Sequence, residues 1–187
     1  MVFLDESGFS PAPYVARTWA PAGRTPVLVH GLRPWERLST LSCVSMRLTY
    51  RRLKFNMYFR IRARTMRSSE VADYLRQLSR HVKGKAIVLM DNARQHKGKS
   101  VSKFFERYPR FEREDLPPYC PELDPDDGVW LWVKRDLANF CPRNVRELRK
   151  KVRGSMMKVQ RRENLIEACL RQSELPCKDL PNQHDHL

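Results

Sequence analysis

The stretch KAIVLMDNA, residues 85–93, decides how the fold is interpreted, because its apolar run ends abruptly in an acid, Asp91. A short apolar run of this kind is typical of a strand that is buried on both faces. The N-terminal stretch VFLDESGF, residues 2–9, repeats the pattern with Asp5. We therefore predict two buried strands, each with a carboxylate at its end.

The segments around these two strands predict a mixed α/β sheet with helices on its faces. Further strands are expected within residues 14–26, 37–50, 58–64 and 110–114. Helices are expected over residues 68–82, 99–108, 125–140 and 156–172, with one more starting at the capping box of Asn144 and Glu147. In such sheets, the carboxyl ends of the strands are where sites usually form.

Length and composition indicate one compact domain of 187 residues. No apolar run approaches the roughly 18 residues that cross a membrane, and the acidic start does not resemble a secretory signal. The five cysteines are scattered and form no C-x-x-C pair, which argues against a disulfide framework or a zinc site. We expect a reducing, cytoplasmic location near the nucleoid and no membrane partner.

The formal net charge of +15 is concentrated in two tracts, residues 47–67 and 143–171, whose own net charges are +8 and +7. Separate basic tracts favour a polyanionic partner, most plausibly nucleic acid, over a merely solvated basic surface. In the first tract, Arg60, Arg62 and Arg64 alternate with apolar residues. This period of two predicts an arginine face on one strand that contacts phosphates.

Four acids follow the proline-rich loop, within residues 122–127. A helix start explains part of the cluster, because Asp124 suits the N-cap, Pro125 the first position and Asp127 the first turn. It does not explain Asp5 and Asp91, which would repel each other unless a cation lay between them. Mg²⁺ is such a cation, since it takes carboxylates together with phosphate oxygens. The cluster is thus either a helix cap or part of a metal site.

Four motifs together resemble the DDE transposases, most closely the mariner-related bacterial insertion-sequence branch: LDESGF, TWAPAGRTP, VLMDNARQH and LPPYCPELDPDDGVWLWVK. The resemblance runs from about Val2 to Lys134. It implies a ribonuclease-H-like fold, a mixed sheet flanked by helices, with extra C-terminal helices. We expect residues 1–140 to form this catalytic domain, residues 141–173 to pack on it or extend it, and residues 174–187 to be a loose tail.

The resemblance also implies a catalytic triad, Asp5, Asp91 and Asp127, that binds two Mg²⁺ or Mn²⁺ ions, with 35 residues between the last two acids. The third acid is usually Glu in this branch, and Asp126 stays open as an alternative ligand. Asp124 stands where the family has Asn, and Gly128 lowers helix propensity by about 1 kcal/mol. Supporting residues are expected at Asn92 and His96, and DNA contacts at Arg60, Arg62, Arg64 and Lys134.

The implied activity is metal-dependent DNA cleavage and strand transfer on transposon ends and target, with a homodimer as a candidate state. Two alternatives remain: a DNA-binding remnant that does not cleave, and a ribonuclease-H-like nuclease outside transposition. The family carries helix-turn-helix modules before its catalytic domain, and this chain starts four residues before Asp5. We therefore expect poor sequence-specific binding, which a footprint on one terminal repeat at physiological salt would contradict.

Overall fold

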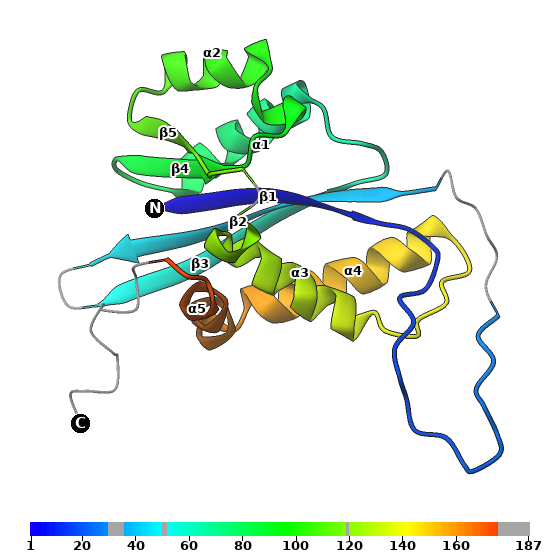
Figure 1. Ribbon diagram of the computed structural model, residues 1–187. Coiled ribbons are helices and arrows are strands. Elements are labelled where there is room, and N and C mark those ends of the chain that lie inside the picture. Colours follow the sequence, from blue (N-terminus) through cyan, green and yellow to red (C-terminus); the bar gives the residue numbers. More distant parts are fainter. Residues whose placement is uncertain (30–35, 50–51, 119, 176–187) are drawn as a thin grey trace.

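The computed structural model describes residues 1–29, 36–49, 52–118 and 120–175, and its centre is a five-stranded sheet in the order β3-β2-β1-β4-β5 (Figure 1). The strands are β1 (Val2–Phe9), β2 (Leu38–Leu48), β3 (Leu53–Arg62), β4 (Ala86–Met90) and β5 (Phe111–Asp115). The first three strands pair antiparallel, whereas β1, β4 and β5 pair parallel. The predicted mixed sheet is confirmed.

Helices cover both faces of this sheet and form two separate cores (Figure 1). One face packs against α1 (Ser68–His81) and α2 (Lys99–Arg107). The other packs against α3 (Pro125–Asp136), α4 (Val145–Gln160) and α5 (Glu163–Gln172). Strand β1 contributes to both cores, because Val2 and Leu4 point to one side and Phe3 and Phe9 to the other.

Asp5 lies in the middle of β1, so the prediction of a carboxylate at that strand's end is wrong. The antiparallel pairing of β1 with β2 continues to Phe9 and extends the strand past the acid. Only the parallel pairing with β4 stops there, at the pair Leu4–Met90. Asp91 follows Met90 directly, as predicted. The two acids therefore lie side by side where the parallel part of the sheet ends.

The segment within residues 14–26 is not a strand, contrary to the prediction. Its backbone makes one isolated bridge, between Tyr14 and Ala138. Four prolines between residues 11 and 26 remove backbone donors that a strand needs. Residues 10–29, called the arm below, instead reach away from the sheet (Figure 1). Trp19 near the tip is 100% exposed.

The C-terminal helices differ in their limits from the predicted ones. Helix α3 ends at Asp136, and Asn139 then takes a left-handed conformation, with φ of 59°. Helix α4 starts at the predicted cap, where the Asn144 side chain accepts a hydrogen bond from the Glu147 N–H at 2.9 Å. It continues to Gln160, so the boundary between the two predicted helices lies after residue 160 and not before residue 156.

The sequence has no Gly or Pro between α4 and α5, which is why the position of this break was predicted wrongly. Within the described residues, no helix combines the length and the hydropathy needed to cross a membrane. Most of the expected loose tail, residues 176–187, lies outside the described part of the chain.

Candidate active site

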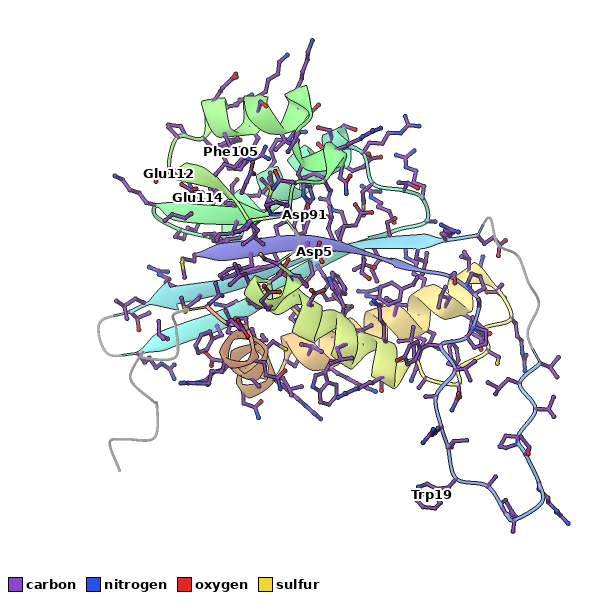
Figure 2. All side chains as sticks on the ribbon, in the orientation of Figure 1. Asp5, Trp19, Asp91, Phe105, Glu112 and Glu114 are labelled. Carbon is purple, nitrogen blue, oxygen red and sulfur yellow. The ribbon has the colours of Figure 1, made fainter. Side chains whose placement is uncertain are left out.

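A pocket of about 460 Å³ opens where β4 ends and α3 begins. Four carboxylates line it: Asp5, Asp91, Asp124 and Asp127. Its other walls come from the turn after β4 and from the proline-rich loop, with Leu116, Pro117, Pro118, Cys120 and Pro121. Figure 2 shows Asp5 and Asp91 next to each other near the middle of the sheet. The fold thus brings the three acids of the predicted triad to one pocket.

Asp5 is held from the side of α3. Its Oδ2 accepts a hydrogen bond from the Trp130 Nε1–H at 2.7 Å. Trp130 is buried and lies three residues after Asp127, so one helical turn carries both a pocket acid and the residue that orients Asp5. Burial raises the pKa of Asp5, the Trp130 hydrogen bond partly offsets this, and the charges of Asp91 and Asp127 raise it further.

Asp91 is held from the opposite side, by the turn that follows β4. Its Oδ1 accepts a hydrogen bond from the Ala93 N–H at 3.0 Å and lies 2.5 Å from the Nδ1 of His96. The hydrogen bond from His96 lowers the pKa of Asp91, against an opposing effect of burial. His96 itself is 0% exposed. It therefore orients Asp91 and cannot reach a DNA phosphate.

Asn92 joins the two loops that border the pocket. Its Nδ2–H donates to the Leu116 carbonyl at 2.9 Å, which links the turn after β4 to the loop after β5. The side chain lines the pocket beside Asp91. Asn92 thus fixes the walls of the pocket.

The start of α3 separates its three acids into different environments. Asp124 is the N-cap, as predicted, and its Oδ1 accepts from the Asp126 N–H at 2.9 Å. It also lines the pocket, and burial together with the charge of Asp5 raises its pKa to about 7. Asp127 lines the pocket as well, with a pKa that burial raises and Lys134 lowers.

Asp126 points away from the pocket, into the interior against β2. It is 0% exposed, and its Oδ2 accepts from the Val44 N–H at 3.4 Å. Its Oδ1 is buried and has no hydrogen-bond partner within the described residues. Burial, and then the neighbouring Asp124, raise its pKa well above the usual range. Burial therefore favours the neutral form of this carboxyl, which has no access to a ligand in the pocket.

The donor set of the pocket fits a hard divalent cation. Carboxylates that raise one another's pKa gain most from a cation between them, and carboxylate oxygens are the ligands that Mg²⁺ and Mn²⁺ prefer. As the side chains stand, no three His, Cys, Asp or Glu groups in the described ranges are close enough to hold one ion together. Asp5 and Asp91 turn instead to Trp130 and His96.

The expected DNA contacts lie apart from the pocket. Strand β3 alternates as predicted but ends at Arg62, so Arg64 is beyond it and forms an ion pair with Glu70 at 2.8 Å. Arg60 donates to Gln77 of α1, and its guanidinium lies 5.8 Å from the centre of the Tyr74 ring. Lys134 lines a separate pocket next to the base of the arm.

Sequence reasoning did not predict that Trp130 donates to Asp5, or that His96 is wholly buried. The i, i+3 spacing of Asp127 and Trp130 could have indicated the first, because both side chains project from one face of α3. Nothing in the local sequence indicates the second, since the burial of His96 depends on how the turn after β4 packs against α1.

Comparison with known families and structures adds three findings. A family model described as DDE superfamily endonuclease matches residues 1–149. A search of curated proteins found no match. The Mos1 mariner paired-end complex with Mg is similar in structure, with a TM-score of 0.63 and 17% identity over 92% of this chain and 53% of that chain.

Two further solved structures are similar to this chain in fold at low sequence identity. The Mos1 transposase paired-end complex with the left transposon end has a TM-score of 0.56 and 18% identity over 92% of this chain and 55% of that chain. The catalytic domain of Mos1 mariner transposase has a TM-score of 0.50 and 16% identity, and the match covers 92% of this chain and 81% of that domain. The ribonuclease-H-like fold is thereby confirmed. The chain spans about half the length of the transposase chains in the paired-end complexes.

Proposed function

Because the chain belongs to the DDE superfamily endonuclease family, we propose that it is the catalytic domain of a transposase that cleaves DNA and joins DNA strands in a metal-dependent reaction. The observation that carries this proposal is the pocket in which Asp5, Asp91 and Asp127 meet. We assign the domain to the mariner-related bacterial insertion-sequence branch, acting on transposon ends and target DNA as a homodimer. Residues 1–140 would form its catalytic core and residues 141–173 its supporting helices.

Asp5, Asp91 and Asp127 would hold two Mg²⁺ or Mn²⁺ ions. When bound, such ions supply the positive charge that activates an attacking oxygen and stabilises the leaving oxygen of a phosphodiester. Trp130 keeps Asp5, and His96 keeps Asp91, in fixed positions at the two sides of the pocket. Asp127 is preferred over Asp126 as the third acid, because only Asp127 faces the pocket.

The test is nicking of supercoiled plasmid with Mn²⁺, Mg²⁺ or EDTA, for the natural chain and for Asp91→Asn, Asp127→Asn and Asp126→Asn. We expect metal-dependent nicking, and loss of at least about 100-fold in rate for Asp91→Asn and Asp127→Asn, the scale of losing one electrostatic contact to the transition state. Asp126→Asn keeps the shape of a buried neutral group and should retain most of the activity. Loss of nicking in Asp126→Asn but not in Asp127→Asn would reject the assignment of the third acid.

A non-catalytic DNA-binding remnant is the second candidate, supported by the absence of a preformed three-ligand group among the described residues. It predicts DNA binding that persists in EDTA and no nicking with either metal. The plasmid assay separates the two candidates directly.

A further inference from the structure

The outer edge of β3 lies along α4 and contains a second pocket, of about 370 Å³. Its lining comes from three residues of the strand and four of the helix: Phe59, Arg60, Ile61, Arg149, Arg153, Met157 and Gln160. We call it the edge pocket. Its lining residues include two exposed arginines from α4 and no acid. This charge favours an anionic ligand.

Side chains of α4 and α5 satisfy three of the outward-facing backbone groups of β3. The Phe55 N–H donates to Glu163 at 3.0 Å, and the Met57 carbonyl accepts from Gln160 at 2.8 Å. The Ile61 carbonyl accepts from Arg149 at 3.3 Å. Because strand groups alternate in direction with a period of two, Phe59 also directs its N–H and carbonyl to this edge. Within the described residues, neither group has a side-chain partner.

The Phe59 backbone groups that lack a side-chain partner and the two arginines of α4 border the same edge pocket. Arg149 and Arg153 are four residues apart on α4, so they project from one side of the helix. Neither arginine forms an ion pair with any acid in the described ranges. Arg60 also lines the edge pocket, but its guanidinium donates to Gln77 of α1, on the other face of the sheet. The free Phe59 N–H and two guanidinium groups that pair with no acid together form a set of donors that suits a phosphate group.

We propose that the edge pocket binds a backbone phosphate of DNA. This contact is separate from the pocket lined by Asp5, Asp91, Asp124 and Asp127, which is called the acid pocket below. Asp5, Ser42 and Phe59 are direct partners across three neighbouring strands. Two strand spacings put the backbone of Phe59, at the border of the edge pocket, about 10 Å from that of Asp5 along the sheet. One turn of duplex, about 34 Å long, is long enough to contact both pockets. The choice of DNA as the ligand rests on the proposed function, whereas the anion preference rests on the edge pocket itself.

The experiment measures binding of a fluorescein-labelled 20-base-pair duplex in EDTA over a series of salt concentrations. The test variant is Arg149→Gln/Arg153→Gln, and the matched control is Lys99→Gln/Lys103→Gln. The control removes the same charge from exposed positions on α2, which packs on the other face of the sheet. Thermal unfolding of all three proteins verifies that both variants are folded.

We expect the test variant to bind about tenfold more weakly than the control, the scale of losing one charge-assisted hydrogen bond. Loss of two phosphate contacts should also lower the slope of log K against log salt by about 2. Equal affinity and equal slope for the two variants would overturn the inference. Since binding is read in EDTA, plasmid nicking that fails while the edge pocket still binds DNA would reject the proposed function alone.

Discussion

At the scale of single residues, Asp124 is the carboxylate of the acid pocket whose pKa is raised most strongly. Its pKa rises from 3.8 to about 7, first through burial and then through the charge of Asp5. The folded-state value therefore lies above the unfolded one. Below about pH 4 this group costs the fold nothing. The cost develops as the pH rises toward 7 and stays constant above that, because the native carboxyl then has to ionise while buried.

We predict that Asp124→Asn stabilises the protein in EDTA, and more so at high pH. Asn is as good an N-cap as Asp, so the hydrogen bond to the Asp126 N–H is retained. At 1.36 kcal/mol per pKa unit, the gain in unfolding free energy over the natural chain should grow by about 2–3 kcal/mol between pH 5 and pH 8. Chemical denaturation at both pH values measures it. The exposed Glu106→Gln serves as control, and a gain that is independent of pH would contradict the prediction.

The residues of the acid pocket could be predicted only in part from the sequence. Asp5 and Asp91 were recognisable because each directly follows an apolar run, a local pattern. The sequence did not decide whether Asp126 or Asp127 is the third acid, because adjacent acids in the first turn of a helix cannot be distinguished by local pattern. Their separation depends on the rotation of α3 against β2, which buries one and exposes the other to the pocket.

At the scale of elements, Gly128 is explained by the contact between α3 and α5 and not by helix propensity. A Cβ at this position would lie 3.0 Å from both Cβ and Sγ of Cys169 and 3.3 Å from its Cα. The sequence indicated only that this glycine lowers the helix propensity of the first turn. The structure gives the glycine a role, since it lets α5 approach α3 closely.

We predict that Gly128→Ala destabilises the protein although alanine favours helices. The gain of about 1 kcal/mol in propensity is outweighed by overpacking, which typically costs about 1–3 kcal/mol. The control is Gly154→Ala in α4, where a Cβ meets nothing within 4 Å and should stabilise by about 1 kcal/mol. Urea denaturation of both variants decides the matter. Equal stabilisation by the two alanines would mean that the helices are not in close contact.

Elements with a clear local period were predictable, and those defined by distant contacts were not. The helix over residues 68–82 and the strand that precedes Asp91 follow from their apolar patterns. The arm resembles a strand locally, but within the described residues it pairs only through the isolated bridge between Tyr14 and Ala138. The break between α4 and α5 arises because α5 packs beneath α3 and β3, a contact that no local pattern encodes.

At the scale of the whole molecule, the arm is separate from both cores. Trp19 is fully exposed, and Val27 is 83% exposed (Figure 2). The arm is tied to the body at its base, where Asn139 exchanges two hydrogen bonds with the backbone of Ala16. Side chains that bury no apolar surface contribute little to the free energy of folding.

We predict that replacing residues 17–28 with a short Gly/Ser linker leaves the fold intact. The melting temperature should stay within about 2 °C of the natural chain, because the replaced side chains pack against neither core. Far-UV circular dichroism on heating measures this. A drop of 10 °C or more would mean that the arm packs onto the body in solution.

The way the sheet ends has a consequence for colloidal behaviour. An open strand edge is a template on which a further copy of a chain can add its own strand and start fibril growth. Here the long edge strand, β3, offers only an interrupted row of groups, because Glu163, Gln160 and Arg149 block three of its positions. The opposite edge, β5, has five residues, three of them acids. Both borders of the sheet therefore discourage strand-by-strand aggregation.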